Sequence, residues 1–105
     1  MSKAHDVLFR TLADPTRRAI FERLCREGEQ TVGALTAQAG VSQPAVSKHL
    51  RVLREADLVS SRVDKQHRRY RLRPARLAEI DAWLAPYRRF WAGRLDALQA
   101  HLDQE

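Results

Sequence analysis

Cysteine is almost absent from this sequence, and so are long apolar runs. Cys25 is the one cysteine in 105 residues, which excludes an intrachain disulfide and fits a reducing compartment. No stretch approaches membrane-spanning length, and the first residues, MSKAHDVLFRTLADP, lack the apolar core of a signal peptide. We therefore expect a cytoplasmic protein in which Cys25 is a buried structural thiol.

Acidic residues are also few: 13 Asp and Glu stand against 19 Lys and Arg, a formal net charge of +6. Such an excess in a small chain suits a polyanion, most simply nucleic acid. The length predicts a single domain, residues 1–105, which would gain buried apolar area by oligomerising. Catalytic motifs are missing too, since there is no glycine-rich phosphate loop, Ser/His/Asp elbow or paired-carboxylate motif. The sequence therefore predicts no enzyme and no cofactor.

Residues 31–56 are predicted to form two helices joined by a glycine turn. Thr31 and Ser42 are suitable N-caps, and Gly40 supplies the turn. The inward faces are apolar: Val32, Leu35 and Ala39 in the first helix, then Val46, Leu50 and Leu53 in the second. The outward face of the second helix is polar and basic: Gln43, Ser47, Lys48, Arg51 and Arg54. This is the helix-turn-helix pattern of DNA-binding proteins, although any two amphipathic helices joined through a glycine resemble it.

Residues 58–73 follow with the alternation of a two-stranded hairpin. Val59, Ser61 and Val63 alternate with polar residues, as do Tyr70 and Leu72. Six basic residues fall within nine positions of its loop and second strand: Lys65, His67, Arg68, Arg69, Arg71 and Arg73. A helix-turn-helix followed by a basic hairpin predicts a winged helix, whose wing contacts the DNA backbone or minor groove. In the alternative interpretation, the arginines only keep an exposed edge strand from pairing with other chains. This explains less well why a basic hairpin directly follows a basic helix.

The terminal segments are predicted to be helices that form a dimer. Residues 4–12 and 75–103 both carry more apolar surface than a small winged helix needs. Pro86 should break or sharply kink the second segment into two helices. Between them, Asp14-Pro15 starts a helix that runs to about Arg26 and ends at Gly28. The predicted dimer residues are Val7, Leu8, Leu12, Tyr87, Trp91, Leu95, Leu98 and Leu102.

Three segments, LADPTRRAIFERL (12–24), SQPAVSKHLRVLREADLV (42–59) and RRYRLRP (68–74), closely resemble the ArsR family of dimeric winged-helix repressors. The resemblance implies a mainly α fold with a small β-hairpin, and a homodimer that leaves its operator when a signal, such as a small-molecule effector, arrives. It also points to DNA contacts by Gln43, Pro44, Ser47, Lys48 and Arg51, and by Lys65, Gln66, His67 and Arg68 of the wing. We expect His49 to pack against the domain instead.

Two positions depart from the family pattern. Asp57 stands where relatives usually have glycine, at a position that needs a left-handed backbone. The wing turn, residues 64–67, also lacks its usual glycine, so we expect a looser tip.

The resemblance also raises metal sensing, the best-known activity of the family. The family's thiolate sensors carry a Cys-x-Cys type motif where this chain has Thr31-Val32-Gly33. Other members bind zinc-like metals between the terminal helices with paired Asp/His and His/Glu groups. Here Asp81 is followed two residues later by Trp83, where such a site would need a histidine. The four histidines show no recurring ligand spacing. We therefore predict no metal site, with a site shared between two chains as the open alternative.

Two functions remain to be compared. The first is a metal-independent homodimeric repressor that reads an operator. The alternative is a winged-helix protein-interaction module that has lost operator reading and works through Trp83, Tyr87 and Trp91. An operator-reading protein should prefer specific DNA and lose affinity steeply with salt.

Overall fold

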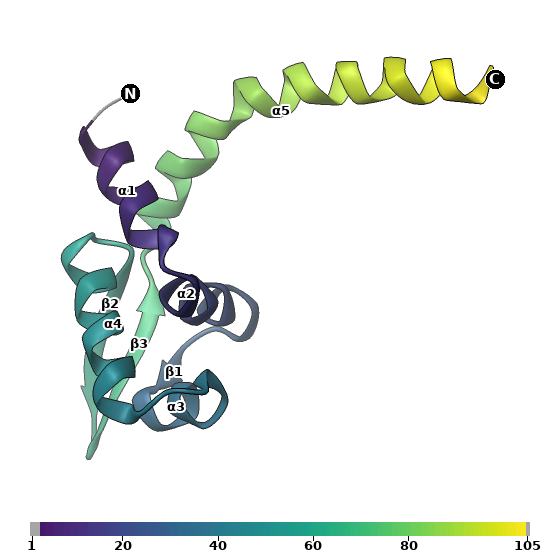
Figure 1. The fold of residues 1–105 in the computed structure, drawn as a ribbon. Helices are drawn as coiled ribbons and strands as arrows, with labels where there is room; N and C mark the ends of the chain where they lie inside the picture. The colour runs from purple at the N-terminus through teal and green to yellow at the C-terminus, as the bar shows by residue number, and fades with distance from the viewer. Residues whose placement is uncertain (1–2, 105) are drawn as a thin grey trace. The chain divides into compact units, whose positions relative to one another are not determined.

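The computed structural model describes residues 3–104. In chain order its elements are α1 (Lys3–Ala13), α2 (Pro15–Glu27), β1 (Gln30–Thr31), α3 (Val32–Ala39), α4 (Gln43–Glu55), β2 (Val59–Asp64), β3 (His67–Leu72) and α5 (Pro74–Asp103) (Figure 1). They form two compact units, Met1–Pro74 and Ala75–Glu105. The predicted class, a mainly α winged helix-turn-helix, is confirmed.

The predicted helix boundaries are confirmed by their caps. The Asp14 carboxylate accepts the backbone N–H of Arg17 at 2.9 Å, and Pro15 follows at the first position of α2. Gly28 ends α2 with a φ of 78°, and Gly40 ends α3 in the left-handed region. Thr31 caps α3 through the N–H of Ala34 at 3.1 Å. Ser42 likewise caps α4, so the turn and the start of the second helix are both fixed locally.

The core of the first unit forms around the apolar side of α4. Val46, Leu50 and Leu53 are each 0% exposed, because their spacing places all three on one side of the helix. The helices α2 and α3 and the strand β2 all pack on α4. The other buried apolar side chains are Leu8, Ile20, Leu24, Leu35, Leu58, Val59 and Tyr70. The polar side of α4 is thereby left at the surface.

A third strand joins the predicted hairpin. The sheet order is β1-β3-β2, with both pairs antiparallel, and β1 pairs only through Gln30 with Tyr70 and Thr31 with Arg69. The prediction of two strands was incomplete because a two-residue strand is too short to show alternation. Within the hairpin, the register from Val59–Leu72 to Asp64–His67 confirms the predicted wing.

The prediction that Pro86 divides the last segment into two helices is wrong. The helix α5 runs without interruption from Pro74 to Asp103, with Pro86 inside it, and bends along its length (Figure 1). A proline removes one backbone hydrogen bond and displaces the preceding turn, which a helix can absorb as a bend. Among the residues described, no helix is long and apolar enough to span a membrane.

The left-handed backbone predicted at Asp57 is confirmed by a φ of 62°. We expect Asp57→Gly to stabilise the protein by up to about 1 kcal/mol, because relief of left-handed strain exceeds the added chain entropy of glycine. The ion pair of Asp57 with Arg73, 3.5 Å long and exposed, contributes little. Urea denaturation should give a higher midpoint. Ala56→Gly is the matched control, because Ala56 has a φ of −85° and should lose stability; a lower midpoint for Asp57→Gly would contradict the strain argument.

Candidate nucleic-acid interface

The outward face of α4 is polar, basic and exposed. The five residues of this helix that the family resemblance assigns to DNA contact are all exposed: Gln43, Pro44, Ser47, Lys48 and Arg51. Within residues 3–104, the side chains of Lys48 and Arg51 form no hydrogen bond or ion pair. Two cations one turn apart are therefore available to an external anion or base edge.

Arg54 and Arg68 connect the end of α4 to the wing. The Ser61 hydroxyl of β2 accepts hydrogen bonds from Arg54 Nη1 at 3.3 Å and from Arg68 Nη1 at 3.2 Å. One oxygen with two lone pairs can accept both. The basic side of α4 thus continues onto the wing through Arg68.

The tip of the wing lies beside the start of α4. Its residues are all exposed: Lys65, Gln66, His67 and Arg68. Three of them, Gln66, His67 and Arg68, line a hollow of about 310 Å³ together with Gln43. The other lining residues are Thr31, Val32 and Gly33, at the start of α3. The structure therefore brings Gln43 and three of the predicted wing residues into one place, 23 or more residues apart in sequence.

The turn at the wing tip is tight despite its lack of glycine. Asp64 and His67 are paired across it, which leaves only Lys65 and Gln66 in the turn, and Lys65 adopts a φ of 59°. Two-residue hairpin turns require a positive φ at their first central residue. Lysine therefore takes a backbone conformation that glycine would adopt without strain.

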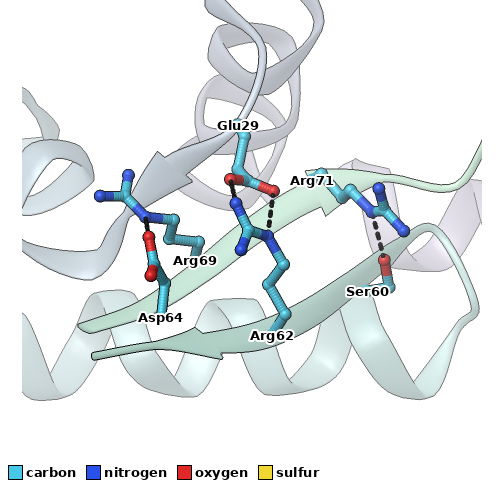
Figure 2. Close-up of polar contacts among 6 residues, drawn as sticks. All are labelled: Glu29, Ser60, Arg62, Asp64, Arg69 and Arg71. Atoms are coloured by element: carbon cyan, nitrogen blue, oxygen red, sulfur yellow. Dashed lines mark hydrogen bonds and ion pairs between the residues drawn. The ribbon is translucent and has the colours of Figure 1, made fainter. Parts of the chain in front are cut away.

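The arginines of the hairpin lie on two different faces of the sheet. Side chains alternate along a strand, so Arg68 and Tyr70 share the face that carries Ser61, while Arg69 and Arg71 lie on the opposite face. On that opposite face Arg69 Nε donates to Asp64 at 3.1 Å and Arg71 Nε donates to Ser60 at 3.4 Å (Figure 2). Grouping all six basic residues by sequence alone therefore overstates the charge that the wing offers on the α4 side.

A longer contact also crosses this opposite face. Glu29, between α2 and β1, accepts two hydrogen bonds from Arg62 of β2, from Nε at 3.1 Å and from Nη2 at 2.8 Å (Figure 2). These bonds lower the pKa of Glu29 below its usual value, and the charges of Arg69 and Arg71 act in the same direction. Sequence reasoning missed this contact, because no local pattern connects residues 33 positions apart.

His49 lies on the body side of α4, as expected. It is half-buried, and its Nδ1 is buried without a hydrogen-bond partner among the described residues. The pKa of Asp14 is lowered chiefly by the N–H of Arg17, and the charge of His49 adds to this effect. His49 is therefore directed towards the start of α2.

Comparison with known proteins decides what kind of DNA-binding fold this is. A family model described as a helix-turn-helix domain matches residues 12–62. The HTH-type transcriptional regulator Rv2034 of Mycobacterium tuberculosis is 42% identical over 103 residues, covering 98% of this chain and 92% of that protein. The solved structure of an ArsR-like transcriptional regulator from Rhodococcus sp. RHA1 is 31% identical with a TM-score of 0.70, covering 92% of this chain and 91% of that one. The chain belongs to the ArsR family of transcriptional regulators.

Members of the ArsR family are DNA-binding regulators, which confirms the prediction that this protein is not an enzyme. Some relatives are named for resistance to arsenic or mercury. The arsenical resistance operon repressor of Escherichia coli is 41% identical over 78 residues, which cover 74% of this chain and 63% of that repressor.

The side chains of this ArsR-family member do not fit a thiolate metal site at the start of α3. Residues 31–33 supply only the hydroxyl of Thr31, which is already the N-cap of α3. In α5, Asp81 accepts from Arg88 at 2.9 Å and Asp103 accepts from Gln99 at 2.8 Å. In the described part of the chain, no three His, Cys, Asp or Glu side chains gather as a metal site would require.

The expectation of a buried Cys25 is wrong, because its side chain is exposed. Cys25 lies in the last turn of α2, where the helix faces solvent. Partial desolvation of the thiol, and next the carboxylate of Glu22, raise the pKa of Cys25 above its usual value. The reactive thiolate is therefore a small fraction at neutral pH.

The second half of α5 exposes a stripe of apolar side chains. Five predicted dimer residues are about half exposed: Tyr87, Trp91, Leu95, Leu98 and Leu102. Phe90, which sequence reasoning missed, is exposed as well, with Trp91 at its edge and the Arg94 guanidinium 4.7 Å from its ring centre. On α1, Val7 and Leu12 are half-buried and Leu8 is only 3% exposed, so Leu8 already belongs to the interior of its own chain.

Proposed function

We propose that this ArsR-family regulator is a homodimeric repressor that binds an operator of its own or a neighbouring operon and needs no metal ion to respond. The observation that carries the operator binding is the exposed face of α4, where Lys48 and Arg51 have no partner inside the described protein. A basic helix face that is not neutralised internally suits the polyanionic backbone and the acceptors of guanine. The protein would act in the cytoplasm, with the DNA.

Each residue of the α4 face suits a particular part of the DNA. Gln43, at the start of the helix, can form two hydrogen bonds with adenine, and Ser47 can donate to a base or a phosphate. Lys48 and Arg51 can reach guanine or phosphate. In the wing, Lys65, Gln66, His67 and Arg68 would contact the backbone or minor groove, because their side chains lie at the exposed tip.

The homodimer is supported by the apolar stripe of α5. Two recognition helices must lie about 34–36 Å apart to read successive faces of the major groove. A second copy would also cover Tyr87, Trp91 and Leu98, whose exposure in one chain is large for a surface helix. A small-molecule effector that shifts the packing of α5 would change this separation and release the operator.

Independence from metal is supported by the donor set. Thr31 caps α3, Asp81 pairs with Arg88, and Cys25 stands alone as a thiol of raised pKa. Metal-independent control can be tested directly, because operator affinity should be unchanged by zinc, by arsenite or by a chelator.

The operator proposal is tested by fluorescence anisotropy on DNA from upstream of the gene and on scrambled DNA, at several salt concentrations. We expect a preference for the upstream DNA and a steep loss of affinity with salt. Lys48→Ala and Arg51→Ala should each lower operator affinity by about 1–3 kcal/mol, because each removes one contact to a base or phosphate.

Arg26→Ala is the matched control, since Arg26 is exposed in the last turn of α2 and its loss changes the net charge equally. Equal weak binding to both DNAs in wild type and variants, together with a failed selection from random DNA, would refute operator reading. The alternative, a protein-interaction module that uses Trp83, Tyr87 and Trp91, would then be favoured.

A further inference from the structure

One side-chain contact on the outer face of the sheet connects the wing to the body of the protein. Glu29 belongs to the body, and Arg62 belongs to β2, the strand separated from β1 by β3. The side chain of Arg62 therefore reaches across the central strand to the carboxylate of Glu29 (Figure 2). The other two contacts drawn on this face, Asp64 with Arg69 and Ser60 with Arg71, lie within the hairpin and do not fix it relative to the body.

The geometry of the pair makes it more specific than an ordinary surface ion pair. The guanidinium of Arg62 donates one hydrogen bond to each carboxylate oxygen of Glu29. Two parallel bonds fix the orientation of the two side chains as well as the distance between them. Arg62 also lies directly opposite Arg69, and like charges in opposed positions destabilise a strand pair. Glu29 offsets that repulsion, while Asp64 neutralises Arg69.

Beyond Arg62 the wing has little support. Val63 is 65% exposed, and the four tip residues that follow Asp64 are exposed as well. The pairing of β1 with β3 stops at Arg69, opposite Arg62, so the hairpin continues from there as two strands alone. If the hairpin changes direction at Arg62, its tip therefore moves relative to the start of α4.

We propose that Glu29 is a positioning residue, which acts through Arg62 to set the direction of the wing and thereby the preference for operator over other DNA. This role rests on the operator binding proposed above. Glu29 also keeps Arg62 occupied, so that this guanidinium does not add a sequence-independent phosphate contact.

Two single variants separate positioning from charge. Glu29→Gln raises the net charge by one and Arg62→Gln lowers it by one, so their electrostatic effects on DNA affinity are opposite. Both, however, remove the ion pair and its two-bond geometry, because a glutamine at position 29 has only one acceptor oxygen. We expect each to lower the ratio of operator to scrambled-DNA affinity by about threefold to fivefold, the size expected of one exposed pair. The double variant Glu29→Gln/Arg62→Gln, with the wild-type net charge, should show the same loss.

The swapped variant Glu29→Arg/Arg62→Glu should recover part of the preference, because it restores a pair between the same positions. Asp64→Asn is the control: it adds the same charge as Glu29→Gln but cuts a contact inside the hairpin, so its preference should stay near that of wild type. Thermal unfolding of every variant by circular dichroism verifies that the fold is retained.

Opposite shifts in the two single variants, with wild-type behaviour in the double variant, would show that only charge matters and would overturn the role of Glu29. An unchanged preference in all variants would overturn it as well. A wild-type protein with no preference for any operator would instead overturn the proposed function, and this role with it.

Discussion

Leu50→Ala is expected to lower the free energy of unfolding by about 3 kcal/mol, a large part of the roughly 5–15 kcal/mol that stabilises a typical domain. Leu50 lies at the centre of the apolar side of α4 and is 0% exposed. Because α2, α3 and β2 all pack on this helix, the lost side chain leaves a space that no single element can fill by moving. The change should also loosen the recognition helix itself.

The measurement is urea denaturation followed by circular dichroism, at one fixed protein concentration because dimerisation also affects stability. The neighbouring variant Arg51→Ala is the matched control. Arg51 is exposed on the same helix, so the free energy of unfolding of Arg51→Ala should stay within about 0.5 kcal/mol of wild type while its DNA binding falls. The two adjacent residues thus separate stability from recognition. A loss below about 1 kcal/mol for Leu50→Ala would mean that the core around α4 is loosely packed.

The recognition helix could be predicted from the sequence because its determinants are local. Ser42 and Gly40 set its start, and Val46, Leu50 and Leu53 define its buried side by spacing alone. Once that side is known, the exposed side follows from helix geometry. The hairpin was predictable for the same reason, since alternation over six residues identifies each strand and its inner face.

The continuity of α5 through Pro86 and the exposure of Cys25 could not be predicted from the local sequence pattern. Pro86 lowers helix propensity, but α5 continues through it as a bend. Cys25 lies close enough to the apolar side of α2 that the pattern alone placed it inside, whereas the structure leaves it in solvent. In α5 the helix itself absorbs the proline, whereas the exposure of Cys25 depends on how α2 packs against the rest of the protein.

The contact of Glu29 with Arg62 is the clearest limit of sequence reasoning here. It joins a short connection to the far strand of the sheet, and its existence depends on β1, a two-residue strand without a pattern of its own. By contrast, the alternation of the strand already predicts that Arg68 lies on one face of the sheet and that Arg69 and Arg71 lie on the other. Treating all the positive charges of the hairpin as one group overlooked this difference.

Leu98→Glu is expected to separate the proposed dimer into monomers and to lower operator affinity by about 10²–10⁴-fold, the gain that linking two half-site contacts provides. Leu98 lies within the stripe formed by Trp91, Leu95 and Leu102, where all four side chains are exposed in a single chain. A carboxylate placed there would have to lose its water against an apolar partner surface, which is strongly unfavourable. Sedimentation equilibrium should give the chain mass of 12.1 kDa instead of twice that value.

Ala100→Glu provides the control for this test, because residue 100 lies about 200° around the helix from residue 98 and is also exposed. It adds the same charge to the same turn of α5 but away from the stripe, so the protein should stay dimeric and keep its operator affinity. If both variants remain dimeric, the stripe is not the dimer interface. If Leu98→Glu is monomeric yet binds the operator as tightly as wild type, each chain reads DNA independently, and α5 has no part in placing the recognition helices.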